Sequence, residues 1–423
     1  MNPFTMNPVL RIRVLVNFFN RLLDSMITSF MAIYLAFSFG VAAAGVLIIV
    51  VVTIGALGML GGGHISDTRG RRRTLLVAEF GIFATYTLMA LGNSHWWGNA
   101  LVVYAGYLLN KLAASVALPA NDAMIVDVTT PETRKAAYTL IYWATNLALA
   151  VGSLLGAWLY NGHFTLMLTI ASTCTAGIVV TTYLLIPETL PNAADAAPRT
   201  SRLKEFTAGY ALVLRDSGFI RLMVAATLIL GIELQIINYV AVRLNLHLPV
   251  QNLVEVGSFA VRVDGVRMLG ILRAENTILV VALMLFAHVL FRRFSDRAVL
   301  YLGTAMFVGG YMVLAVSDIG WALLIAGLVF TVGELMSVPV RQTMLANMVP
   351  ENSRTRYMAV YNLNLRLAQG IAALFITIGS VVPPWGIALL YAAMGLVIVQ
   401  QYRVLLARPT ARDELVTPVS AKA

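Results

Sequence analysis

Twelve stretches of predominantly apolar residues follow one another along the chain, each long enough to cross a bilayer as a helix. A transmembrane helix needs about 20 such residues. Only 12% of the residues are charged and 59% are hydrophobic, whereas soluble domains carry about 25% charged residues. We therefore predict an all-α membrane protein with 12 transmembrane helices. The predicted spans lie near residues 14–36, 42–64, 74–93, 99–122, 137–160, 164–186, 219–244, 273–291, 298–317, 321–346, 357–380 and 385–406.

Lysine and arginine gather in alternate connections between these spans. About 22 of the 30 basic residues fall on one side, for example in residues 69–73, 199–221 and 292–297. Because cytoplasmic connections carry the excess of Lys and Arg, we predict that both termini are cytoplasmic, in a bacterial inner (plasma) membrane. The same distribution explains the net charge of +10, so we expect no nucleic-acid partner.

The connection between spans seven and eight is unusually long. Residues 258–269 alternate in polarity around the pair Asp264-Gly265, which is typical of a tight β-turn. We predict a small external β-hairpin there, and an irregular loop is the alternative.

Two segments about 220 residues apart match each other. Residues 118–135 and 338–355 each contain a proline, a methionine five residues later, and then Pro-Glu followed by an arginine. This repeat predicts two pseudo-symmetric six-helix bundles, and two similar halves around a binding site suit alternating access. The predicted parts are an N-terminal bundle (1–190), a cytoplasmic connector (191–218), a C-terminal bundle (219–408) and a cytoplasmic tail (409–423).

A glycine-rich and basic motif lies between spans two and three, Gly63-His-Ile-Ser-Asp67-Thr-Arg-Gly70-Arg71-Arg-Arg. It resembles the G-x-x-x-D-R-x-G-R-R signature of the major facilitator superfamily, with Thr68 where Arg or Lys is usual. Glycine allows close helix approach at the first position and a tight turn at Gly70. The resemblance implies that Arg71 pairs with Asp127, at the end of span four. It also implies a set of cytoplasmic gate residues, namely Gly63, Asp67, Gly70, Arg71 and Asp127.

Within the superfamily, the chain resembles the LmrP-type family of proton-coupled multidrug exporters. The similar stretches include Ala123-Met-Ile-Val-Asp, Tyr142-Trp-Ala-Thr-Asn and Phe330-Thr-Val-Gly-Glu. The resemblance implies proton-coupled export of lipophilic drug-like compounds by a monomer. It implies no cofactor beyond the proton gradient, and no catalytic or metal-binding residues. At two positions where the family has acids, this chain has Ile141 and Ile237.

Charged side chains inside the predicted spans are candidate functional groups, because each costs about 2.5–3.5 kcal/mol or more at the bilayer centre. We predict three proton-coupling acids, in the order Glu334, Asp24 and Glu233. Desolvation favours the neutral form of a carboxylic acid, whereas a nearby cation favours the charged form. A permanent salt bridge is the alternative, above all between Asp24 and Arg21 on one helix face. The predicted substrate-cavity residues are Arg21, Lys111, Arg366, Asn20, Gln235 and Asn238.

The surplus of cations among these residues supports a second function, proton-coupled transport of peptides, amino acids or other zwitterionic or anionic small molecules. Span one also contains Asn17-x-x-Asn20-Arg21, which resembles the E-x-x-E-R motif of proton-coupled peptide transporters without its two acids. A membrane enzyme or a ligand sensor is a third possibility. Against an enzyme, the chain has no nucleotide-binding loop and no His-Glu-x-x-His motif. We expect the partners to be a small-molecule substrate, protons and the lipid bilayer. Glu79, one turn into span three, is expected to reach the cytoplasmic surface.

Overall fold

The computed structural model describes residues 8–189, 213, 215–256, 259–284, 295–349 and 354–407. In the first half of the chain the helices are α1 (Pro8–Phe39), α2 (Val41–Arg69), α3 (Arg71–Gly92), α4 (Ala100–Asp127) and α5 (Pro131–Leu185). The second half contains α7 (Ser217–Glu233), the 3-10 helix η3 (Leu234–Ile237), α8 (Tyr239–His247), β1 (Gln251–Val256), β2 (Phe259–Val263), α9 (Gly265–Met284), α11 (Asp296–Val316), α12 (Gly320–Met348), α13 (Arg354–Tyr361), α14 (Leu363–Ile378) and α15 (Pro384–Leu406).

These helices account for the twelve predicted spans. Nine helical segments in the described ranges are long and apolar enough to cross a membrane. One of them is α5, which contains two predicted spans because its backbone leaves helical geometry at Asn161–His163. The other two predicted spans overlap α9 and α14, which are not among these nine segments. Helices α7, η3 and α8 together form span seven.

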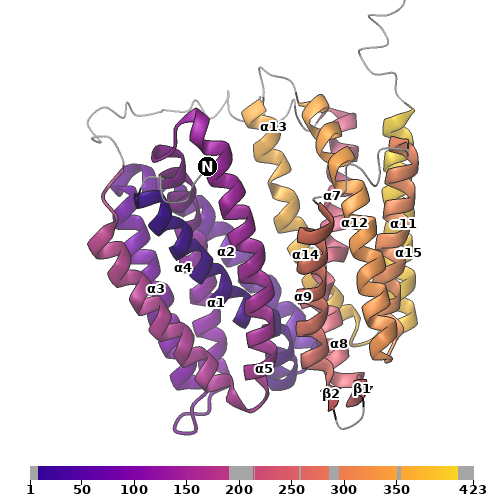
Figure 1. The fold of residues 1–423 in the computed structure, drawn as a ribbon, viewed down its shortest axis with the longest axis horizontal. Coiled ribbons are helices and arrows are strands. Elements are labelled where there is room, and N and C mark those ends of the chain that lie inside the picture. The colour runs from indigo at the N-terminus through magenta and orange to yellow at the C-terminus, as the bar shows by residue number, and fades with distance from the viewer. Residues whose placement is uncertain are drawn as a thin grey trace, which may run out of the picture.

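The helices form two bundles that lie side by side (Figure 1), α1–α5 in one and α7–α15 in the other. Each bundle has a large hydrophobic core of its own. The bundles meet where α5 packs against α9 and where α2 packs against α14. Most of the predicted connector 191–218 and all of the predicted tail 409–423 lie outside the described residues.

The β-hairpin is present, but its predicted turn is wrong. Strands β1 and β2 pair antiparallel, with Gln251 opposite Val263 and Val256 opposite Phe259. Asp264 instead begins helix α9, where its Oδ1 accepts a hydrogen bond from the Arg267 backbone N–H at 2.8 Å. An Asp-Gly pair suits a helix start as well as a turn, because aspartate is a favoured N-cap. Gly265 is required for packing, since a Cβ there would collide with the carbonyl oxygen of Leu244 in α8.

Close approach of α2 and α4 depends on Gly62 rather than on the predicted Gly63. A Cβ on Gly62 would lie 2.5 Å from the carbonyl oxygen of Val116, whereas one on Gly63 would meet only the Pro119 Cβ at 3.9 Å. Neighbouring helix positions point about 100° apart because a turn takes 3.6 residues. The glycine that allows this close packing is therefore Gly62, the residue just before the motif.

We expect Gly62→Val to destabilise the protein, because the larger side chain would force α2 away from α4. Overpacking of this kind costs about 1–3 kcal/mol, which would lower the unfolding temperature measured in detergent. The matched control is Gly61→Val, because Gly61 is exposed and a Cβ there meets nothing within 4 Å. An equal loss of stability in both variants would contradict this packing.

Candidate functional site

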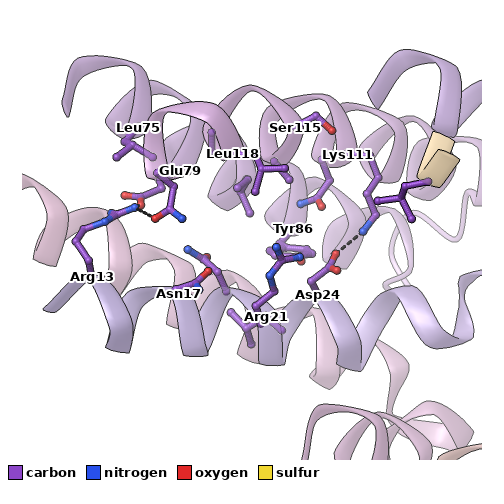
Figure 2. Close-up of a pocket in the computed structure, with 18 of the residues that line it drawn as sticks. Arg13, Asn17, Arg21, Asp24, Leu75, Glu79, Tyr86, Lys111, Ser115 and Leu118 are labelled. Carbon is purple, nitrogen blue, oxygen red and sulfur yellow. Dashed lines mark hydrogen bonds and ion pairs between the residues drawn. The ribbon is translucent and has the colours of Figure 1, made fainter. Parts of the chain in front are cut away.

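A polar cavity lies between the two bundles. It consists of two adjoining pockets of about 290 Å³ and about 280 Å³. The first pocket is lined mainly by α1, α3 and α4, and ten of its residues are labelled in Figure 2. The second also takes in α2 and, from the other bundle, η3, α9 and α14. Five residues line both pockets: Asp24, Lys111, Ser115, Arg366 and Gln369.

Asp24 and Lys111 form an ion pair in this cavity (Figure 2). Lys111 Nζ also donates a hydrogen bond to Thr28 Oγ1 at 2.6 Å, and Thr28 donates to Asp24 at 3.0 Å. The side chains of Asp24 and Lys111 remain 37% and 18% exposed, so both reach the cavity. The ion pair that Asp24 forms is therefore with Lys111 on another helix, and not with Arg21, the partner named in the alternative interpretation. The long lysine side chain reaches Asp24 from α4.

Arg273 also lines the cavity, although it was not predicted from the sequence. Span eight was predicted to begin at residue 273, but α9 begins at Gly265. Arg273 is therefore two turns inside the helix and lines the cavity together with Arg366. The signal was available, because Asp264 is a good N-cap ahead of an apolar run. Within the described residues, the structure shows no ion pair for Arg273, Arg366 or Arg21.

Two of the three predicted polar cavity residues line the cavity. Asn20 lies in the first pocket and Asn238 in the second. The prediction is wrong for Gln235, whose side chain is fully buried and donates to the carbonyl oxygen of Gly231 at 2.9 Å. The 3-10 segment Leu234–Ile237 changes the helix rotation there.

Three glutamates lie within the described helices of the second bundle: Glu233, Glu275 and Glu334. Glu334 Oε2 on α12 accepts a hydrogen bond from Asn276 on α9 at 3.4 Å. Glu233, at the end of α7, interacts electrostatically with Glu334 and with Arg341. In the part of the chain that the structure describes, neither Glu233 nor Glu334 forms an ion pair. Glu275, also missed because of the late predicted start of span eight, has a buried Oε2 that makes no hydrogen bond to any residue in the described ranges.

Glu79 is buried, contrary to the expectation that it reaches the surface. It is 1% exposed and forms an ion pair with Arg13, with 3.6 Å between its Oε1 and Arg13 Nη1. Arg13 also donates to Asn121 Oδ1. Glu79 faces α1 rather than solvent, and the pair lies at one end of the first pocket (Figure 2).

The expected contact between Arg71 and Asp127 is present as an ion pair. Gly70 has a φ of +98°, the left-handed conformation expected for this tight turn. Glu188, just after α5, accepts hydrogen bonds from the backbone N–H groups of Arg71 and Arg72 at 3.0 and 3.1 Å. The side chain of Asp67 lies outside the described part of the structure.

Contacts between the bundles close the cavity toward the β-hairpin. Asn161 Nδ2 donates to Asp264 Oδ2 at 3.0 Å, and Thr377 Oγ1 donates to the carbonyl oxygen of Ala42 at 3.0 Å. Figure 1 shows the bundles converging at the hairpin end and diverging at the other. If the termini are cytoplasmic as predicted, this conformation is closed on the external side.

Two six-helix bundles around a central charged cavity define the class of secondary transporters that work by moving one half against the other. The comparison with protein families agrees, because the family model of the Major Facilitator Superfamily matches residues 14–263. The chain belongs to the major facilitator superfamily. It is a multi-pass membrane transporter rather than an enzyme.

Several characterised transporters are similar to it. The Na(+), Li(+), K(+)/H(+) antiporter of Planococcus maritimus is 28% identical over 377 residues, covering 88% of this chain and 89% of that protein. The multidrug resistance protein MdtH of Sodalis glossinidius is 23% identical over 313 residues, covering 73% and 70%. Among solved structures, a POT family transporter in complex with a thioalcohol-conjugated peptide has a TM-score of 0.75 at 13% identity, covering 94% and 95%. The nucleoside transporter NupG has a TM-score of 0.69 at 13% identity, covering 95% and 100%. At 13% sequence identity, the similarity to these two solved structures shows a shared fold only.

Proposed function

We propose that this protein is a proton-coupled secondary transporter that exports small organic molecules across a bacterial inner membrane. The observation that carries this proposal is the pair of glutamates, Glu233 and Glu334, which lie inside the membrane without an ion-pair partner among the described residues. A carboxylate in that position is expensive to keep charged. It therefore suits a group that alternately binds and releases a proton. The name of the Planococcus relative, a proton antiporter, supports the same coupling.

Alternating access supplies the cycle. In the conformation described here, protons and cargo exchange with the side opposite the hairpin. Rocking of the bundles would break the contacts of Asn161 with Asp264 and of Thr377 with Ala42, and would open the external side. Glu334 is the first coupling acid in this scheme, with Asp24 and Glu233 as the others. In an antiporter, release of cargo outside is followed by proton binding at these acids.

Lipophilic drug-like compounds are the first candidate cargo. The LmrP-type stretches and the name of the MdtH relatives support this class. Drug-sensitive bacteria that express the protein should gain resistance, and inverted vesicles should accumulate a labelled drug when a pH gradient is imposed. If neither effect is seen with a chemically broad panel of drugs, drug export is excluded.

Zwitterionic or anionic small molecules are the second candidate cargo. This alternative is favoured by Arg21, Arg273 and Arg366, which face the cavity without ion pairs in the described residues. Competition of labelled cargo by unlabelled dipeptides and amino acids separates this candidate from the first.

We also propose that the ion pair of Arg71 with Asp127 acts in the cytoplasmic gate, by fixing the start of α3 against the end of α4. Arg71→Ala is expected to slow transport strongly while leaving cargo binding in detergent unchanged. Arg73→Ala is the matched control, because Arg73 lies in the same turn and is exposed. Equal transport rates in the two variants would argue against a role for this pair in the gate.

A further inference from the structure

We infer that the central cavity contains an anion-binding site built from both bundles, with Lys111 from α4, Arg273 from α9 and Arg366 from α14. The site would bind a carboxylate, sulfonate or phosphate group on an amphipathic cargo. This inference rests on the proposed transport function and narrows the class of molecule that it moves.

The three cations converge from opposite sides of the interface. Arg366 reaches from α14 toward α2 and α4, because a Cβ placed on Gly55 would lie 3.6 Å from Arg366 Nη1 and 3.1 Å from Ser115 Oγ. Arg366 Nη2 also contacts Met59 Sδ at 3.4 Å. Arg273 lines the same pocket as Lys111 and interacts electrostatically with Asp24. An anion placed among these cations would therefore contact both halves of the transporter.

The charge of the lining favours an anion. The two pockets are lined by five basic residues, Arg13, Arg21, Lys111, Arg273 and Arg366, and by two acids, Asp24 and Glu79. Subtracting the two acids from the five basic residues leaves an excess of three positive charges when all are ionised. Unpaired charges away from bulk water are costly, and a bound anion would compensate part of this excess. Arginine is also well suited to carboxylate, sulfonate and phosphate groups because its guanidinium can donate two parallel hydrogen bonds.

Part of the second pocket is apolar, which explains why the cargo should be amphipathic. Its wall includes four aliphatic side chains close to the charged groups: Val51, Val52, Leu234 and Ile237. A molecule with an apolar body and one anionic group would match both parts of the lining. A permanent organic cation would match the apolar part only.

The carboxylate of Asp24 would compete with a cargo anion for Lys111. Asp24 forms an ion pair with Lys111 in the present structure. When cargo binds, its anionic group would replace the Asp24 carboxylate as the partner of Lys111. Arg21, three residues earlier on the same helix, already interacts electrostatically with Asp24 and would then neutralise it. Tyr107 on α4 and Tyr86 on α3 also interact electrostatically with Asp24, and Thr28 donates a hydrogen bond to it.

The test uses three compounds with the same naphthalene skeleton: a sulfonate, the neutral sulfonamide and a quaternary ammonium. Binding to the purified full chain in detergent is measured by equilibrium dialysis. We expect the sulfonate to bind at least about tenfold more tightly than the other two, as a charge-assisted contact would give. Arg273→Gln and Arg366→Gln should each weaken sulfonate binding by about tenfold or more, while Asp24→Asn should strengthen it. Arg273→Lys, which keeps the charge, should retain most of the binding.

The control is Arg403→Gln, because Arg403 is exposed on α15 and lies outside both pockets. Preferential binding of the quaternary ammonium, or sulfonate binding that neither arginine substitution weakens, would overturn the inference. The test distinguishes a failure of the inferred anion site from a failure of the proposed proton-coupled transport. If the sulfonate binds as predicted but no compound drives proton movement in liposomes, the anion site stands and the proton coupling is wrong.

Discussion

Glu334→Gln is expected to abolish cargo transport driven by a pH gradient, while exchange of labelled for unlabelled cargo continues. Glutamine has nearly the same size as glutamate, and its carbonyl oxygen can still accept the hydrogen bond from Asn276. It cannot bind and release a proton. The variant should therefore bind cargo and change conformation, but the proton gradient should no longer drive net transport.

Two assays on the same proteoliposomes separate these steps. Net uptake is measured with an imposed pH gradient, and exchange is measured with equal cargo on both sides. Glu255→Gln is the control, because Glu255 is an exposed acid in the hairpin. If Glu334→Gln retained full gradient-driven transport, the coupling role would pass to Glu233 or Asp24. Loss of exchange as well would indicate that Glu334 is required for conformational change or cargo binding.

Lys111→Gln is expected to impair both stability and transport. The substitution removes the cation that pairs with Asp24 and donates to Thr28. Loss of such charge-assisted hydrogen bonds costs about 1.5–3 kcal/mol. The cost should fall toward the lower end because Asp24 remains 37% exposed to the cavity. Unfolding temperature in detergent and gradient-driven transport report the two effects.

The double variant Asp24→Asn/Lys111→Gln distinguishes a structural contribution from a functional one. Removing both charges leaves no uncompensated carboxylate, so stability should recover toward that of the wild type. Transport should not recover, because Lys111 is part of the anion site. Lys111→Arg, which keeps the charge, serves as the conservative control. A double variant as unstable as Lys111→Gln alone would show that the ion pair is not the source of the stability effect.

The fold could be predicted because its main determinants are local. Long apolar segments specify membrane-spanning helices, and the match between residues 118–135 and 338–355 indicated the two bundles. The same holds for Gly70, whose turn requires a positive φ. The contact of Arg71 with Asp127 was expected from the superfamily resemblance rather than from the spacing of the residues, and it is present.

The site was harder to predict because it depends on contacts between helices and on helix rotation. Nothing in the sequence places Lys111 closer than Arg21 to Asp24, since Lys111 is on another helix. The 3-10 segment at Leu234–Ile237 turned Gln235 into the protein interior. Arg273 was missed because the predicted span began eight residues too late, after Asp264-Gly265 had been assigned to a turn. A one-residue shift likewise moved the packing role from Gly63 to Gly62.

The most direct test of proton coupling is proton movement in proteoliposomes that contain a pH-sensitive dye. Candidate cargo is added to the wild type and to Glu334→Gln without an imposed gradient. We expect a transported compound to cause a pH change inside the wild-type liposomes, and we expect Glu334→Gln to abolish that change. Transport of labelled cargo by the wild type with no accompanying proton movement would rule out proton coupling and would identify the protein as a uniporter or a carrier coupled to another ion.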